Sequence, residues 1–353
     1  MSHEKKIDGL IFQRLALIIL VVYATVILIA CDGDTHKGKG FISVSDKAPG
    51  WASVSGGTTG GGSDLSEAVT VSNMDALQNA LKGNDRKIIL VVPGTYEGTL
   101  EPGARTTIIG TQPGVIINGN IKISGSDKNN IIIRNLAVRD KKCSSHSECK
   151  YGSDAVKIIN GAHHIWFDHV SVSDGQDGNF DVTLSADFVT CSWCFFYYSY
   201  KKEHRSSNLI AGSDDEIESR GKLNITYMNS MWGEGVLSRQ PRGRFGKIHM
   251  LNNYHKNSGR LYGVGREMAI IAEGCFYDMP IWRKNDLFYA IGAGPANWKG
   301  VDNRGNAKGM NSSRGKVFNI PYSYNKMSAS DAKAAITSPS CGAGNTCYLK
   351  MEI

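Results

Sequence analysis

Three aspartates are spaced in a way that suits a metal site. Asp154 precedes a short β-branched run, and Asp177 and Asp181 follow in the segment DGQDGNFD (174–181). Three carboxylates brought together repel one another unless a cation neutralises them, and an all-oxygen ligand set favours a hard ion such as Ca²⁺ over zinc or copper. Taken alone, DGQDGNFD is more often an ordinary acidic turn. The pattern therefore predicts a calcium site only if the fold brings the three side chains together.

Two arginines further along the chain suit an anionic ligand. Arg239 and Arg244 lie in RQPRGRFG (239–246), which Pro241 stiffens. Guanidinium groups bind planar anions such as carboxylates. Without a partner site, the same arginines would only solvate the edge of a fold. Together, the aspartates and arginines describe a groove for a polyanion, with calcium on one side and arginine on the other.

One phrase recurs around these residues: a short β-branched or aromatic run, then a small or amide residue, then an aromatic. It appears in NNIIIRNLAV, HHIWFDHVSV, DFVTCSWCFF, LNITYMNSMW, KIHMLNNYH and AIIAEGCFY. The steps between copies are 34, 24, 36, 23 and 22 residues, aligned on Leu136, Val170, Cys194, Ser230, Asn253 and Cys275. Repeats of this length cannot bury an apolar face alone, so they must stack.

The composition of each copy predicts a strand, because Ile, Val, Phe, Tyr and Trp precede Gly, Asp, Asn or Ser. Leucine-rich repeats need regularly placed leucines, and propeller blades need about four strands per forty or so residues. Neither pattern occurs in the sequence. One strand per repeat with loops of unequal length favours an all-β fold, a parallel β-helix, with a β-sandwich as the alternative.

Two helices are predicted, one before and one after the strand repeats. The segment SNMDALQNALKG (72–83) has Ser72 or Asn73 as N-cap and apolar residues at helical spacing. A helix there would cover the open core of the first coil. The segment ASDAKAAITSP (329–339) predicts a final helix capped by Ser330.

The first 31 residues are predicted to lie outside the fold. Basic residues precede an apolar run over 15–30, which is short for a membrane span of about 20 residues and has the layout of a secretory signal. The run ends in LIAC, which resembles a bacterial lipobox and implies lipidation at Cys31. An uncleaved anchor or an ordinary signal is the alternative. Residues 32–49 are expected to be a flexible tether, and residues 50–353 the β-helix domain.

Eight cysteines and a net charge of +7 add two further expectations. The charge favours an acidic partner. Two cysteine pairs in loop sequence suit local disulfides of an exported protein, Cys143 with Cys149 and Cys341 with Cys347. A single Cys-x-x-Cys is only half a zinc site. The remaining cysteines of the domain are therefore predicted to be buried thiols: Cys191, Cys194 and Cys275.

Taken in order, several motifs resemble polysaccharide lyase family 1, the pectate lyases. The resemblance covers about 50–340 and rests on GWASVSGGTTGG, TTIIG, GSDAV, HHIWFDH, DGNFD, NLIAGSDDE and RQPRGR before HMLNN. Several long motifs in the family's order are far more specific than any one of them. The resemblance implies a right-handed single-stranded parallel β-helix, Ca²⁺ as cofactor, and cleavage of polygalacturonate by β-elimination.

The resemblance also implies residue roles. Asp154, Asp177 and Asp181 match calcium ligands. Arg239 matches the residue that takes the proton from C5 of galacturonate, and Arg244 matches an arginine that binds a substrate carboxylate. By contrast, the Asp and His that end HHIWFDH (163–169) are expected to be a buried hydrogen-bonded pair that supports a coil.

Two parts of the sequence depart from the family pattern. Gly152 stands where the family often has another calcium-binding acid, which implies an ion bound more weakly or only with substrate. Ser206 and Ser207 stand where many members have a substrate-binding lysine. Three cations of the loop YKKEHRSSN (200–208) could replace it: Lys201, Lys202 and Arg205. We select Lys202 as the expected substrate-binding residue.

The leading hypothesis is a calcium-dependent pectate lyase, monomeric, without nucleic-acid partners, and exported as a bacterial envelope lipoprotein on the outer membrane or cell surface, or else secreted. A pectin lyase acting on the neutral methyl ester would not need the acidic cluster. A galacturonan hydrolase would need paired carboxylic acids around the glycosidic oxygen and no arginine pair. A non-catalytic pectate-binding β-helix would use the same groove without cleavage.

Overall fold

The computed structural model describes residues 39–143, 145, 147–150, 152–257, 259–280 and 286–350. The compact unit begins at Gly40. The predicted signal segment 1–31 and its lipidation site Cys31 lie outside the described residues and stay predictions. Within the described ranges, no helix is long and apolar enough to span a membrane.

The predicted tether over 32–49 is wrong from Gly40 onward. Phe41–Ser43 forms strand β1, which pairs in parallel with β28 (Tyr348–Lys350). Asp46 then accepts a hydrogen bond of 2.8 Å from the Arg134 guanidinium. Because β28 lies at the other end of the sequence, no local pattern could have indicated this pairing.

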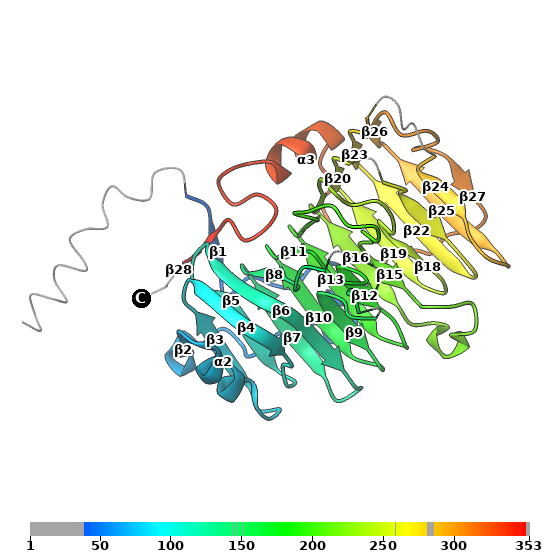
Figure 1. Ribbon diagram of the computed structural model, residues 1–353. Helices are drawn as coiled ribbons and strands as arrows, with labels where there is room; N and C mark the ends of the chain where they lie inside the picture. Colours follow the sequence, from blue (N-terminus) through cyan, green and yellow to red (C-terminus); the bar gives the residue numbers. More distant parts are fainter. Residues whose placement is uncertain are drawn as a thin grey trace, which may run out of the picture. The chain divides into compact units, whose positions relative to one another are not determined.

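The domain is a right-handed parallel β-helix with one chain winding through successive coils, as predicted (Figure 1). Every strand pair among the described residues is parallel except β25 with β27, so the β-sandwich alternative is excluded. Each coil contributes one strand to an 11-stranded sheet and two short strands to a 15-stranded sheet. The 15-stranded sheet contains two ladders, here called the front ladder and the side ladder, which meet at β6.

The strands of the 11-stranded sheet are β2 (Val69–Val71), β3 (Lys87–Val91), β5 (Thr106–Gly110), β7 (Asn129–Arg134), β10 (His163–Asp168), β13 (Asp187–Ser192), β16 (Asn224–Met228), β19 (Lys247–Leu251), β22 (Met268–Glu273), β25 (Ala296–Val301) and β27 (Ser313–Arg314). The front ladder contains β4 (Gly94–Leu100), β6 (Val115–Ser124), β9 (Val156–Ile159), β12 (Phe180–Val182), β15 (Leu209–Ile210), β18 (Arg242–Gly243), β21 (Tyr262–Val264) and β24 (Phe288–Ala290). The side ladder contains β8 (Ala137–Arg139), β11 (Ser171–Ser173), β14 (Phe195–Tyr197), β17 (Met231–Trp232), β20 (Tyr254–His255), β23 (Phe276–Tyr277) and β26 (Arg304–Gly305).

The repeat found in the sequence corresponds to one corner of each coil. The residue just before each aligned position has a positive φ and turns the chain from the 11-stranded sheet into the side ladder: Asn135, His169, Trp193, Asn229, Asn252 and Gly274. Asparagine tolerates the left-handed conformation because its short polar side chain bonds locally. Asn135 donates to the Gly110 carbonyl one coil earlier at 2.9 Å, and Asn252 donates to the Gly274 carbonyl one coil later at 3.0 Å. These amides therefore link neighbouring coils.

Inward-facing aromatic rings fill the middle of the solenoid. Phe180 is fully buried and packs against Phe167 and Phe196, with ring centroids 5.0 and 5.9 Å apart. Because side chains alternate along a strand, burying Phe180 and Val182 turns Asp181 to the outer face of the front ladder. The core thus positions one of the predicted metal ligands.

The two predicted helices are present. α2 (Met74–Leu81) is N-capped by Asn73, whose side chain accepts from Ala76 N, and it buries Leu77 and Leu81 against the first coils. α3 (Ala329–Ile336) is N-capped by Ser328, so the predicted cap Ser330 is wrong. Ser328 is the last residue with extended backbone, and its hydroxyl accepts from the Asp331 amide. α3 packs against β20 and β23 rather than closing the end of the solenoid (Figure 1).

The cysteine predictions are confirmed. Cys143 is disulfide-bonded to Cys149, and Cys341 to Cys347. The other three cysteines of the domain are free and buried: Cys191, Cys194 and Cys275. Cys191 on β13 and Cys194 just after it both belong to the hydrophobic core.

Candidate active site

The three predicted aspartates come from neighbouring coils of the front ladder. Asp154 lies just before β9, Asp181 lies on β12, and Asp177 lies in the loop between them. A Cβ added at Gly178 would lie 2.6 Å from Asp181 Oδ1 and 3.0 Å from Asp154 Oδ1. The two carboxylates therefore converge over Gly178, where an added methyl group would displace them.

The proximity of these carboxylates changes their acidity. Burial raises the pKa of Asp154 to about 6, and the negative charge of Asp177 adds to this while Lys157 opposes it. Burial and then the charge of Asp154 raise the pKa of Asp181 well above its usual range. A hydrogen bond with His204 is the main cause that lowers the pKa of Asp177 to about 2. The charged forms of Asp154 and Asp181 are thus disfavoured relative to an exposed carboxylate, and a bound cation would stabilise them.

The donor set fits a hard cation. Asp154 Oδ1 is buried and has no hydrogen-bond partner within the described part of the chain. A buried carboxylate oxygen without a donor is costly, and a cation would satisfy it. The ligand atoms of the three aspartates do not all lie within 4.8 Å of one another. Those of His169, Cys341 and Cys347 do, but these two cysteines form a disulfide and so are not free to bind a metal. An ion held by the aspartates therefore needs further oxygen ligands.

Two basic side chains that sequence reasoning missed, His204 and Lys157, approach the carboxylates. His204 Nε2 lies 3.1 Å from Asp177 Oδ1. Lys157 Nζ lies 3.7 Å from Asp154 Oδ2 and donates to the Gly152 carbonyl at 2.9 Å. The sequence does indicate that Lys157 faces outward, because it alternates with the inward-facing residues of the strand VKII (156–159).

Arg239 faces the aspartates from the loop before β18. It has a positive φ and precedes the cis peptide bond between Gln240 and Pro241. The charge of Arg239 lowers the pKa of both Asp177 and Asp181, so its guanidinium acts electrostatically on both carboxylates. Arg239 Nη1 is buried and has no hydrogen-bond partner among the described residues. The structure therefore places Arg239 within electrostatic reach of two of the three aspartates, Asp177 and Asp181.

Arg244 lies on the other side of β18 and is already paired. Its Nε donates to Asp214 Oδ1 at 2.7 Å, and its Nη1 lies 3.4 Å from the carbonyls of Ala211 and Gly212. The hydrogen bond to Arg244 lowers the pKa of Asp214. The segment NLIAGSDDE thus fixes the orientation of Arg244, a role that the sequence motif alone did not reveal.

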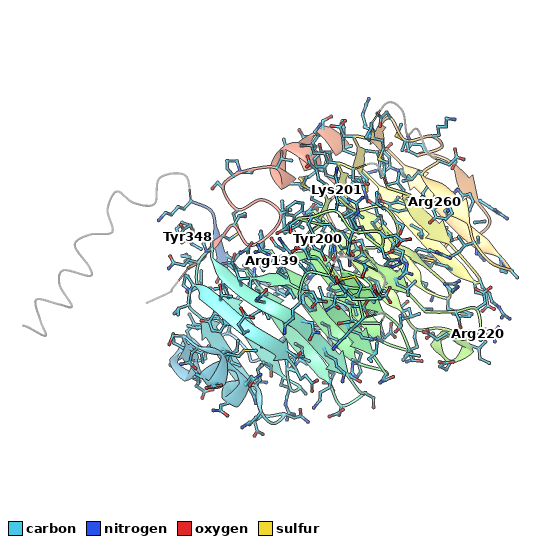
Figure 2. The ribbon with its side chains drawn as sticks, in the orientation of Figure 1. Arg139, Tyr200, Lys201, Arg220, Arg260 and Tyr348 are labelled. Atoms are coloured by element: carbon cyan, nitrogen blue, oxygen red, sulfur yellow. A yellow bond between two sulfur atoms is a disulfide. The ribbon has the colours of Figure 1, made fainter. Side chains whose placement is uncertain are left out.

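Positive charge continues along later coils of the front ladder. Burial lowers the pKa of Arg242, and the charges of Arg244, Arg239 and Arg260 lower it further, although Tyr289 opposes this. The Arg260 guanidinium lies 4.9 Å from the centroid of the Tyr289 ring. Figure 2 labels Arg260 beside the later, yellow coils. Neither arginine was assigned a role from the sequence: Arg242 stands in RQPRGRFG beside Arg239, and Arg260 lies outside every quoted motif.

Lys202 is not placed to bind substrate, which corrects the sequence prediction. Only 6% of this residue is exposed, and its ammonium donates to the carbonyls of Gly175 and, at 2.9 Å, of Gln176. Burial lowers the pKa of Lys202 to about 8. Its ammonium instead supports the turn that leads to Asp177.

Asp168 and His169 are a buried pair away from this cluster, as expected. Asp168 accepts from His169 Nδ1 at 2.9 Å, from Arg134 Nε at 2.9 Å and from the Ser192 hydroxyl at 2.6 Å. Despite the opposing effect of burial, the charges of His169 and Arg134 hold the pKa of Asp168 well below its usual range. The pair therefore stabilises the coil at β10.

Comparisons with known proteins agree with this geometry. A family model described as pectate lyase matches residues 38–346. Pectate lyase A of Dickeya chrysanthemi is 32% identical over 287 residues, covering 65% of this chain and 72% of that protein. Pectate lyase A of Aspergillus niger is 30% identical over 307 residues, covering 83% and 87%. The fold matches a mutant of Bacillus subtilis pectate lyase with a TM-score of 0.70 at 21% identity, covering 88% of this chain and 99% of that one.

Proposed function

The chain belongs to the pectate lyase family of polysaccharide lyases, and we propose that it cleaves α-1,4-linked polygalacturonate by calcium-dependent β-elimination, releasing unsaturated oligogalacturonates. The observation that carries this proposal is the cluster of Arg239 with Asp154, Asp177 and Asp181 on one face of the front ladder. A galacturonan hydrolase has no use for an arginine in that position.

Asp154, Asp177 and Asp181 would hold the calcium ion. The buried Asp154 Oδ1 without a donor and the raised pKa of Asp181 both support a cation there. When bound, calcium would stabilise the charge that develops on the substrate carboxylate and offset the aspartate charges that face Arg239. Because the three carboxylates are widely spaced, a substrate carboxylate is a natural source of the remaining oxygen ligands. Gly152, in place of another acid, supports binding of the ion together with substrate.

Arg239 would remove the proton from C5 of the galacturonate. That proton is only weakly acidic, so the negative charge that develops on the carboxylate side must be stabilised as it leaves. The C5–H electrons form the C4–C5 double bond, the bond from C4 to the glycosidic oxygen breaks, and that oxygen takes a proton from water. A guanidine can take this proton only in its neutral form, because the guanidinium has no free lone pair to accept it.

Arg244 would bind a substrate carboxylate, with its orientation fixed by Asp214. A bidentate guanidinium contact adds both affinity and a defined orientation of the sugar. This contact would hold the galacturonate so that C5–H points at Arg239.

One assay tests the proposal. Polygalacturonate with calcium should give products that absorb ultraviolet light through the new C4–C5 double bond, and a chelator should abolish this signal. New reducing ends without the absorbance would indicate a hydrolase. Retention of pectate without either signal would indicate a non-catalytic binding protein.

We also propose export as a lipoprotein anchored at Cys31, acting as a monomer. The leader pattern supports this proposal, and the two disulfides suit an oxidising compartment. Mass spectrometry of the mature N-terminus in the native host tests it. A diacylated Cys31 that Cys31→Ser abolishes is expected, whereas an N-terminus at another residue without lipid would reject the anchor.

A further inference from the structure

A row of outward-facing residues extends from the aspartate cluster toward the first coils. In the register of the front ladder, Asp181 on β12 lies opposite Lys157 on β9, and Lys157 lies opposite Lys122 on β6. Parallel strands are about 4.8 Å apart, so the two lysines follow Asp181 at successive coil steps. The neighbours of Lys122 on β6, Ile121 and Ile123, are fully buried, which turns Lys122 outward.

A cavity of about 340 Å³ lies at this end of the row. Its lining includes three lysines, Lys122, Lys150 and Lys157, with Asp154 as the one acid, and the remaining lining is neutral. The cavity therefore carries a net positive charge and shares Asp154 with the candidate active site.

The three lysines are not needed merely to neutralise Asp154, because Lys157 already lies 3.7 Å from it. Lys122 is 3.7 Å from Glu101, but both side chains are largely exposed, so the pair is weak. The Lys150 ammonium forms no ion pair with a carboxylate of the described residues. The Lys150 backbone is nevertheless fixed, since its amide donates to Gln176 Oε1 at 2.9 Å. Lys122 and Lys150 thus keep positive charge available to an anion.

We propose that this lysine-lined cavity, formed by Lys122, Lys150 and Lys157, is a further binding site for a uronate carboxylate of the substrate chain. The inference rests on the proposed function, because a polygalacturonate chain bound along the front ladder would run past Asp154 into the cavity. Ammonium groups bind this carboxylate directly, whereas the aspartates bind theirs through an ion. The cavity therefore selects an unesterified unit, since a methyl ester carries no charge.

The lysine-lined cavity predicts that binding affinity depends on the length of the substrate chain, whereas the aspartate cluster alone predicts no such dependence. A short oligogalacturonate can occupy the ion and Arg239 without reaching Lys122. A longer chain gains the lysine contacts and loses them again in high salt, because exposed charges are screened. Affinity should therefore rise with length only while both lysines are present.

The test compares Lys122→Ala/Lys150→Ala with a control of equal charge, Lys247→Ala/Lys299→Ala, whose lysines are exposed on the 11-stranded sheet. Binding of trigalacturonate, hexagalacturonate and methyl-esterified hexagalacturonate is measured by calorimetry with calcium, in the Arg239→Ala background so that no substrate is cleaved. In the otherwise wild-type enzyme, KM and kcat are measured on polygalacturonate.

The cavity variant should bind hexagalacturonate about five- to tenfold more weakly than the control, with the trimer and the methyl ester unaffected. KM should rise by a similar factor with little change in kcat. Equal hexamer affinity in cavity variant and control would overturn the proposal, as would equal losses for hexamer and trimer. Failure of the proposed function would be seen separately. In that case the parent enzyme would give no unsaturated product, and this result does not depend on how the lysine variants bind.

Discussion

His204 Nε2 lies 3.1 Å from Asp177 Oδ1, so one of the three clustered carboxylates already has a partner in the chain. The pKa of Asp177 is correspondingly low, about 2, whereas the pKa of Asp154 is raised to about 6. The cluster is therefore uneven: Asp177 is charged over the whole ordinary pH range, and Asp154 becomes charged only near neutrality. An added cation has most to stabilise at Asp154 and Asp181.

This unevenness predicts how stability depends on pH when calcium is chelated. Asp154 has a pKa of about 6 when folded against a usual value of 3.8, so the folded protein holds its proton more tightly. The resulting destabilisation is absent below about pH 3.8, grows as the pH rises, and reaches on the order of 2 to 3 kcal/mol above pH 6. We expect Asp154→Asn to raise the melting temperature of chelated protein at pH 8 but hardly at pH 4. Calcium should likewise raise the melting temperature of the parent protein mainly at pH 8.

Thermal melts of the parent and Asp154→Asn at both pH values, with chelator and with calcium, check this. Asp75→Asn on the exposed face of α2 serves as the control for loss of one carboxylate. If Asp154→Asn raised the melting temperature equally at pH 4 and pH 8, the burial of a charged Asp154 would not be the cause of the stabilisation.

Replacing Arg239 tests the proposed base. We expect Arg239→Ala and Arg239→Lys to lose about 100- to 10,000-fold in kcat, the usual contribution of a positioned base. Arg220→Ala, which removes an exposed guanidinium paired with Glu267, should keep the parent rate. Ultraviolet absorbance of the products and a thermal melt of each variant are measured together. Full turnover in Arg239→Ala with an unchanged melt would remove Arg239 from the mechanism.

Asp214 is expected to act through Arg244. Asp214→Asn removes the charge that holds the Arg244 guanidinium at 2.7 Å, so Arg244 becomes mobile and must be ordered by substrate. We expect KM for polygalacturonate to rise about tenfold with a smaller change in kcat. Asp215→Asn, an identical change at the adjacent exposed residue, is the matched control. If both variants had the KM of the parent, substrate binding would not require Asp214 to orient the Arg244 guanidinium.

The sequence was sufficient to predict those parts of the fold that repeat or that depend on local packing. The copies aligned on Leu136 to Cys275 mark the corner of each coil, because each corner needs a left-handed residue before a buried one. The short spacings of the cysteines predicted the disulfides, and the helix start signal narrowed the first N-cap to Ser72 or Asn73. Ser328 was missed in favour of Ser330, since two serines near a helix start differ only in backbone conformation.

Parts of the site depend on stacking between coils and have a weaker local signal. Lys202 and His204 lie two residues apart in one loop, yet Lys202 is buried under Gln176 while His204 reaches Asp177. Their order in the loop does not reveal which side chain turns toward the groove. The sequence indicates that Lys157 points outward, but only the register of β9 with β12 places it opposite Asp181.

Gly178 gives the sharpest test of how the aspartates converge. A methyl group at this position would lie 2.6 Å from Asp181 Oδ1 and 3.0 Å from Asp154 Oδ1, closer than atoms approach without displacement. Gly178→Ala should therefore push the two carboxylates apart without adding charge or removing a ligand.

We expect Gly178→Ala to need at least about tenfold more calcium for half-maximal activity, because a rigid ligand set loses affinity when its oxygens are displaced. Gly212→Ala is the control, since its new methyl group would meet only Glu216 Oε2 at 3.7 Å, an ordinary contact. Calcium titrations of the ultraviolet assay and a melt in chelator are measured for both. Because the melt reports folding separately, a folded Gly178→Ala with the calcium requirement of Gly212→Ala would mean that Asp154 and Asp181 do not share an ion.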